Sequence, residues 1–170
     1  MSMGAFLDSA LTDERLHAVP HSLGQQARRW LYGTDDVSRM LDDLADTQLG
    51  KRHGRARAVV DTFLSGEIVN VRLPPSKNVS AHAALLEDRD DEIWEFRARD
   101  PFPGIRIFGR FVDKDHFVAL RWAYKEECET DEEYAYWKIQ TKIEWAKFFA
   151  VLLPFRGVRA RDYVSNCVSF

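Results

Sequence analysis

The sequence has few cysteines and no long hydrophobic run, and each shortage excludes a class of protein. Its two cysteines, Cys128 and Cys167, have neither a metal-ligand spacing nor the density of a disulfide scaffold, so they fit a reducing compartment. The longest apolar run, residues 148–153, is far shorter than the ~20 residues that a membrane-spanning helix needs. The first ten residues lack the basic start of a secretory signal. We therefore expect a cytoplasmic protein without a membrane partner.

Excess positive charge and cofactor motifs are also lacking. The formal net charge is −3, so nucleic-acid binding would require a local basic patch on an acidic protein. The chain has no phosphate-binding loop of the Walker type, no dinucleotide-type glycine pattern and no Gly-x-Ser-x-Gly turn. His17 and His21 are four residues apart but Pro20 lies between them, so they do not have the helical spacing of metal ligands. We expect neither a metal site nor a cofactor.

The residues that are present predict an α+β domain. A length of 170 residues with 45% hydrophobic residues suits one packed domain. Capping signals and apolar spacing predict helices over about residues 23–32, 35–49, 56–65, 79–87 and 131–153. Alternating apolar residues predict strands over about residues 69–73, 92–98, 105–112 and 116–124. The last three strands are joined so closely that they must form an antiparallel meander.

The flanking segments complete the expected organisation. Residues 1–50 are predicted to form a helical N-terminal extension, and residues 51–150 the α+β domain itself. Residues 151–170 are predicted to be a tail packed on the same domain, with a final edge strand.

Five arginines on the meander form the first candidate site. They are Arg97, Arg99, Arg106, Arg110 and Arg121. Side chains two residues apart on a strand share a face, so some of these guanidinium groups could gather into a phosphate-binding cluster. The alternative is a sheet face on which the arginines pair with carboxylates such as Glu95 and Asp100. The strand register decides between the two.

A basic segment and the histidines are further candidates. Residues 51–57 carry Lys51, Arg52, Arg55 and Arg57 ahead of a predicted helix, where they would either seat a phosphate or form a solvated loop. Of the histidines, His82 and His116 are nearest in sequence to the meander. Either could be a general base beside a phosphate or a structural histidine.

The meander resembles a known family. Three runs carry the resemblance, namely Ile-Trp-Glu-Phe-Arg at 93–97, Gly-Ile-Arg-Ile-Phe at 104–108 and Phe-Val-Ala-Leu-Arg-Trp-Ala-Tyr-Lys at 117–125. Followed by a capped helix, they resemble the RelE/ParE superfamily of bacterial toxins, closest to its phage-derived, HigB-like group. The resemblance covers about residues 55–147. It implies a RelE-like α+β fold, in which an antiparallel meander packs against N-terminal helices and a C-terminal helix.

The resemblance also implies a function. Many members are metal-independent, ribosome-dependent mRNA endonucleases of toxin–antitoxin systems, and others act on DNA gyrase. By position, Arg97 and Arg106 match the two motif arginines and Lys125 matches the first lysine of a closing pair. Glu126 stands where the second lysine is expected. That charge reversal favours the alternative, a non-catalytic binding or accessory protein of phage or mobile-element origin.

A mechanistic hypothesis assigns the remaining roles. Arg97 and Arg106 would stabilise the phosphate during RNA cleavage, while Tyr124, Lys125 and His116 would transfer protons at adjacent strand ends. The predicted nucleic-acid contacts are Lys51, Arg52, Arg55, Arg57, Arg99, Arg110 and Arg121. The implied partners are an antitoxin protein and ribosome-bound RNA.

Overall fold

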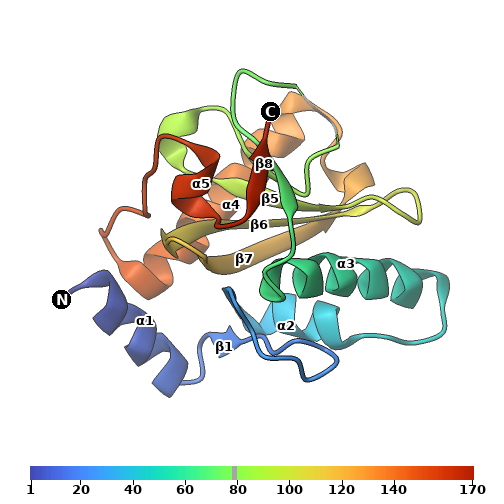
Figure 1. Ribbon diagram of the computed structural model, residues 1–170, viewed down its shortest axis with the longest axis horizontal. Helices are drawn as coiled ribbons and strands as arrows, with labels where there is room; N and C mark the ends of the chain where they lie inside the picture. The colour runs from blue at the N-terminus through green and yellow to red at the C-terminus, as the bar shows by residue number, and fades with distance from the viewer. Residues whose placement is uncertain (78–79) are drawn as a thin grey trace.

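The computed structural model describes residues 1–77 and 80–170 and consists of one mixed sheet of eight strands with helices on both faces (Figure 1). The strands are β1 (His17–Ala18), β2 (Trp30–Gly33), β3 (Val69–Arg72), β4 (Ala83–Leu85), β5 (Trp94–Ala98), β6 (Ile105–Asp113), β7 (His116–Tyr124) and β8 (Cys167–Ser169). Their order across the sheet is β1-β2-β7-β6-β5-β4-β3-β8. The α+β class predicted from the sequence is therefore confirmed.

The predicted meander forms the centre of this sheet. β5 pairs antiparallel with β6, and β6 pairs antiparallel with β7. The register shifts between Phe108 and Gly109, which is a β-bulge. A Cβ atom at Gly109 would lie 2.0 Å from the carbonyl oxygen of Val118, so only glycine fits this close approach. The bulge separates the part of β6 that carries Arg106 from the part that carries Arg110.

Two segments that were predicted to be helical are strands instead. β2 lies parallel to β7 and buries Leu31 and Tyr32, which is a non-local pairing that local helix signals do not reveal. The hydroxyl of Ser22, predicted to cap a helix, hydrogen-bonds the Asp61 carboxylate. β4 pairs with β3 and β5 within the predicted helix 79–87, and residue 79 itself lies outside the described residues.

The helices before the meander are divided differently from the prediction. α2 (Asp35–Asp42) begins after Thr34 as expected, and the Thr34 hydroxyl accepts a hydrogen bond from the Val37 backbone N–H. The next helix, α3 (Gln48–Leu64), begins at Gln48 because the Thr47 hydroxyl accepts the Gly50 N–H at 2.9 Å. Gly50 therefore lies inside α3 rather than ending a helix. The whole basic segment 51–57 is helical.

The C-terminal helix begins where the sequence predicts but ends at Phe149, four residues before the predicted end. α4 (Asp131–Phe149) begins with the expected capping box, in which Thr130 and Glu133 satisfy each other's backbone N–H groups. Beyond it, the short helix α5 (Ala160–Tyr163) precedes β8, which pairs parallel with β3 and forms the edge strand expected in the tail.

The two faces of the sheet carry separate hydrophobic clusters. α2, α3 and α5 pack on one face, against residues such as Phe96 and Phe117, whose rings stack at 4.4 Å. α4 and α1 (Met3–Thr12) pack on the other face, against Val118 and Leu120. Figure 1 shows α2 and α3 below the sheet and α4 behind it. Polar residues of β5 and β6 that alternate with this core therefore point towards α4.

The terminal segments are integrated into the sheet. Residues 1–50 contribute β1 and β2 as well as helices, so they differ from the expected helical extension, and residue 50 lies within α3. Arg29 is fully buried and its guanidinium donates to the carbonyl oxygens of Phe63, Glu67 and Ser165. This side chain joins the N-terminal segment, α3 and the C-terminal tail. Among the described residues, no helix is both long and apolar enough to cross a membrane.

Candidate nucleic-acid interface

The two motif arginines lie directly opposite each other and share one buried carboxylate. Arg97 on β5 is the register partner of Arg106 on β6. The Glu95 carboxylate, which is fully buried, lies 2.6 Å from the Arg97 guanidinium and 3.6 Å from that of Arg106. The Tyr134 hydroxyl of α4 donates to the same carboxylate at 3.1 Å. Burial and this neighbouring negative charge raise the pKa of Tyr134, so its hydroxyl stays protonated as a donor. The register thus brings the two arginines together, but as part of a partly neutralised internal cluster.

Arg110 and Arg121 also contact α4 or a loop next to it. The Arg110 guanidinium lies 5.4 Å from the centre of the Trp145 ring and donates to the Asp91 carbonyl oxygen at 2.7 Å. Arg121 forms an ion pair with Glu144 at 2.8 Å. Both guanidinium groups hold α4 or a neighbouring loop against the sheet, so their contacts in this structure are internal.

The residues predicted to transfer protons do not meet. His116 begins β7 and Tyr124 ends it, so they are about 27 Å apart at ~3.4 Å per residue. Tyr124 points towards α3, whereas the Lys125 amine donates to the Cys128 carbonyl oxygen and lies 5.6 Å from the Tyr134 ring on the α4 side. The expectation that these groups gather at adjacent strand ends is therefore wrong.

His116 has its own local partners. Its ring stacks on Trp30 at 4.5 Å, and its Nδ1 lies 3.0 Å from the Tyr32 hydroxyl. Burial lowers the pKa of His116, despite the opposing effects of Asp113 and Asp115. These contacts connect β7 with β2, far from the motif arginines.

Tyr124 belongs to a hydrogen-bonded chain across α3. Its hydroxyl lies 2.9 Å from His53 Nε2, and His53 Nδ1 lies 2.8 Å from the Asp43 carboxylate. The Arg52 guanidinium covers the Tyr124 ring at 4.1 Å and binds Glu126 through two hydrogen bonds of 3.0 and 2.7 Å. The acidic residue at position 126 thus has a structural partner, since it fixes Arg52.

The basic segment 51–57 divides into buried and exposed residues because it is helical. Arg52 and Arg57 are buried, and Arg57 contacts the Pro20 carbonyl oxygen and the Asp61 carboxylate. Lys51 is largely exposed, 3.8 Å from Asp46. Arg55 is exposed and forms no hydrogen bond or ion pair with the residues the structure describes. Of the four predicted phosphate contacts in this segment, Arg55 has the least compensated charge.

Arg55 lines a small basic hollow together with two meander arginines. The hollow has a volume of about 220 Å³ and lies between α3, the residues before β4 and the end of β5. Its charged lining residues are Arg55, Arg97, Arg99, His82 and Asp100. Among the described residues, Arg99 makes one long hydrogen bond, to the Ala81 carbonyl oxygen at 3.4 Å. Positive groups therefore outnumber the one carboxylate in this hollow.

The electrostatics of the hollow reflect this excess of positive charge. The pKa of Arg99 is lowered by burial and then by the nearby charges of Arg97 and Arg106. The pKa of His82 is lowered by burial and then by Arg99 and Arg55, so its neutral form is favoured. A bound anion would relieve both effects, because its negative charge stabilises the charged guanidinium and imidazolium groups.

Nothing in the sequence favoured His82 over His116. In the structure, His82 is the histidine that lines the hollow together with the three arginines. Its backbone carbonyl accepts the Arg97 N–H at 2.9 Å, and its Nδ1 accepts the Asn70 N–H at 3.2 Å. Nε2 therefore carries the proton in the neutral ring and is a donor. No local sequence signal distinguishes the two histidines, since the choice depends on β4 pairing with β5.

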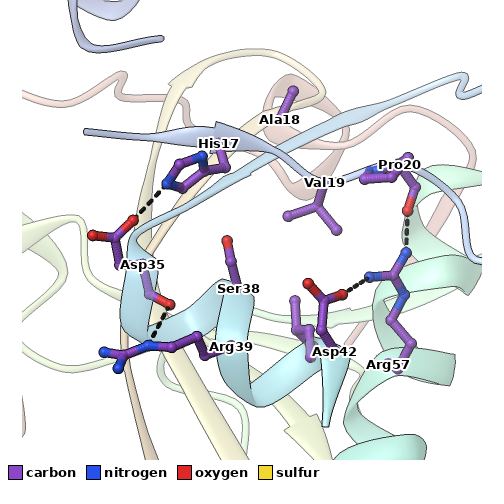
Figure 2. A pocket seen from close by; sticks show the side chains of 10 residues that line it. His17, Ala18, Val19, Pro20, Asp35, Ser38, Arg39, Asp42 and Arg57 are labelled. Carbon is purple, nitrogen blue, oxygen red and sulfur yellow. Dashed lines mark hydrogen bonds and ion pairs between the residues drawn. The ribbon is translucent and has the colours of Figure 1, made fainter. Parts of the chain in front are cut away.

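Two of the larger hollows among the described residues have linings of mixed charge. One, of about 610 Å³, lies on the other side of Arg97 and is lined by acidic and basic side chains together with Tyr134. The other, of about 570 Å³, lies between β1 and α2. Figure 2 shows His17 pointing to Asp35 and the Arg57 guanidinium directed at Asp42. The His17 ring nitrogen lies 2.5 Å from the Asp35 carboxylate. Opposite charges in these hollows already face one another, so neither has the unbalanced charge of the Arg55 hollow.

Among the described residues, no three histidine, cysteine, aspartate or glutamate side chains lie close enough together to hold a metal ion.

Comparisons with protein-family models, curated proteins and solved structures find no match. Any function therefore has to be argued from the residues of the site.

Proposed function

We propose that the chain is a toxin-like RNA-binding protein that cleaves RNA without a metal, with the scissile phosphate in the Arg55 hollow. The observation that carries the proposal is the convergence of Arg55, Arg97 and Arg99 with His82 on one small hollow. Guanidinium groups bind phosphate oxygens through paired, charge-assisted hydrogen bonds. The meander motifs that resemble RelE/ParE toxins also support RNA cleavage. On the basis of this resemblance, the proposed partners are an antitoxin protein and ribosome-bound mRNA.

The lining residues suggest how the reaction would proceed. The ribose 2′-oxygen attacks the adjacent phosphorus, the bond to the 5′-oxygen breaks, and the products are a 2′,3′-cyclic phosphate and a 5′-hydroxyl. Arg55 and Arg99 stabilise the charge on the phosphorane oxygens. The neutral His82 ring donates its Nε2–H to a phosphorane oxygen. The Asp100 carboxylate accepts the 2′-hydroxyl proton, and the leaving 5′-oxygen takes a proton from water. These proton-transfer roles replace those first assigned to Tyr124, Lys125 and His116.

A specific observation favours a second candidate, a non-catalytic binding or accessory protein. The fully buried Glu95 carboxylate neutralises part of the charge of Arg97 and Arg106, which the family resemblance would place at the reacting phosphate. A protein of this kind would bind RNA or a protein partner and leave RNA intact.

Induced expression in a bacterial host tests the proposal, with growth and mRNA integrity followed together. We expect growth arrest with mRNA fragments that end in 2′,3′-cyclic phosphate. Arg99→Ala should relieve both effects, because loss of one such donor typically lowers a rate by ~10²–10³. Lys114→Ala is the control, an exposed basic residue in the turn between β6 and β7, at the opposite end of the meander from Arg99. Arrest with intact mRNA would reject RNA cleavage, and RNA binding without cleavage by the purified protein would support the accessory alternative.

A further inference from the structure

The outward face of α4 is unusually apolar for an exposed helix surface. Tyr136, Ile139 and Ile143 are 55%, 53% and 47% exposed, although they follow one another at intervals of three and four residues on one side of the helix. The buried side of the same helix packs Trp145 and Phe149 on the sheet. Single exposed apolar residues are ordinary, but a continuous row on one helix marks an interaction surface.

The exposed positions of α4 are arranged symmetrically about Ile139. Before it the exposed residues are Asp131, Glu132, Ala135 and Tyr136, and after it they are Lys142, Ile143, Ala146 and Lys147. Each position on one side has a counterpart at the same separation on the other. Asp131 and Lys147 are both eight residues from the centre, and Ala135 and Ile143 are both four residues from it. The outer face of any regular helix has this spacing, and here it allows a two-fold axis to pass through Ile139.

Opposite charges lie at the two ends of this face. Asp131 and Glu132 form no ion pair among the described residues at the N-terminal end. Lys142 and Lys147 lie at the C-terminal end, where they pair with Asp91 and Glu144 at 2.7 and 2.8 Å. Because both lysine side chains are about half exposed, these ion pairs contribute little and can be exchanged for others.

We propose that a second copy of this chain docks on α4, with the two α4 helices antiparallel and related by a two-fold axis at Ile139. In that arrangement Ile139 meets its equivalent, Ile143 packs against Ala135 of the second copy, and Lys147 lies opposite Asp131 of the second copy. Large residues meet small ones, and each acidic end meets a basic end, so the contact is self-complementary in shape and charge. A parallel arrangement would place like charges together at both ends.

This interface is independent of the proposed RNA site. α3, which carries Arg55, packs on the opposite face of the sheet from α4. None of the residues that line the Arg55 hollow belongs to α4. The dimer therefore leaves the hollow open, and loss of the dimer does not by itself remove the phosphate-binding residues.

Sedimentation equilibrium of the full chain tests the dimer at concentrations up to 100-fold apart. We expect a mass twice the 19.7 kDa of one chain at the higher concentrations. Ile139→Lys brings two positive charges together on the axis and should weaken association by about a hundredfold or more. Ile68→Lys, at a 60% exposed site outside α4, should leave it unchanged. A monomeric parent chain, or a dimer that tolerates Ile139→Lys, would overturn the proposal.

Cross-linking tests the antiparallel geometry separately, without relying on weakened association. In a Cys167→Ser background, Ile139→Cys should oxidise to a covalent dimer because residue 139 meets its own equivalent. Ile143→Cys should not, since the two copies of residue 143 would be offset by about 12 Å along the helix axes at ~1.5 Å per residue, beyond the reach of a disulfide. Efficient cross-linking at 143 with none at 139 would reject the two-fold axis at Ile139.

Discussion

Arginines of the same meander have two different environments. On the face covered by α4, Arg106, Arg110 and Arg121 are fixed by carboxylates, carbonyl oxygens and an aromatic ring. At the end of β5, Arg99 makes one long hydrogen bond and lies beside Arg55, which has no ion pair among the described residues. The difference shows that the partner of a guanidinium group, more than its place in a motif, separates a structural arginine from one that is available to a ligand.

Arg97 belongs to both environments. Its guanidinium pairs with the buried Glu95 carboxylate, and its side chain also lines the basic hollow. Glu95 therefore connects the internal cluster with the proposed phosphate site. Changing one residue of each environment in turn separates their contributions.

The largest effect is expected at Glu95. Glu95→Ala leaves Arg97 and Arg106 buried without their shared carboxylate, so the free energy of unfolding should fall by about 3–5 kcal/mol. Urea denaturation would measure the loss. Glu67→Ala, at an exposed carboxylate, is the control and should change stability by less than about 0.5 kcal/mol. A loss at Glu95 that is no larger than the control would mean that the cluster is not structural.

The second-largest effect is expected at Arg99, in the Arg55 hollow. It should lower the affinity for RNA and leave the stability unchanged. Arg99→Ala should weaken binding of a short single-stranded RNA by about ten- to a hundredfold, because a hydrogen bond to a charged group is worth ~1.5–3 kcal/mol. Its free energy of unfolding should stay within about 0.5 kcal/mol of the parent. Fluorescence anisotropy and urea denaturation of the same samples measure the two quantities. Arg106→Ala should give the opposite result, with stability lost first.

A smaller effect is expected at the α4 contact with Glu95. Tyr134→Phe removes the hydroxyl that donates to this carboxylate at 3.1 Å and should lower the free energy of unfolding by about 1.5 kcal/mol. Tyr136→Phe is a matched control on the same helix, because its side chain is 55% exposed. Equal stability of the two variants would show that the Tyr134 hydrogen bond does not support the cluster.

The smallest effect is a dependence of stability on pH through His82. Burial and the nearby Arg99 and Arg55 lower the pKa of His82 in the folded protein below the ordinary value of 6.5. The unfolded chain then binds the proton first, so this contribution to stability is complete above about pH 6.5 and is lost as the pH falls towards the folded pKa. We expect this to be the smallest of the four effects.

His82→Asn should flatten this profile between pH 7 and pH 5, measured by urea denaturation at each pH. His116, whose pKa burial also lowers, should maintain the remaining slope. RNA bound beside His82 should reduce the slope as well, because its phosphate charge raises the pKa of the ring. An identical profile in His82→Asn and the parent chain would contradict the environment described for His82.

Local signals in the sequence predicted the parts of the fold that depend on neighbouring residues. The capping box at Thr130 and the alternation along β5, β6 and β7 are of this kind, and the structure confirms both. β2 and β4 were missed because their strands are stabilised by pairing with distant segments, β7 in one case and β3 and β5 in the other. Their short apolar runs satisfy helix and strand patterns equally.

The candidate site was predictable only in its residue types. Arg55, Arg97 and Arg99 were all selected from the sequence, but nothing in the sequence indicated that α3 would bring Arg55 to the end of β5. Arg52 and Arg57 could not be separated from Arg55 until the segment was known to be helical, since helix phase decides which of them are buried. His82 was indistinguishable from His116 for the same reason, because its position depends on tertiary pairing.

The salt dependence of RNA binding tests the central claim most directly. For single-stranded RNA, the slope of log affinity against log salt concentration is about −0.7 for each phosphate that the protein neutralises. We predict that the Arg55→Ala, Arg99→Ala double variant has a slope shallower by about 0.7 than the parent chain, because both side chains contact the one phosphate assigned to the hollow. The Arg121→Ala variant should keep the parent slope. An unchanged slope in the double variant, or no RNA binding by the parent chain, would contradict the assignment of the hollow to phosphate.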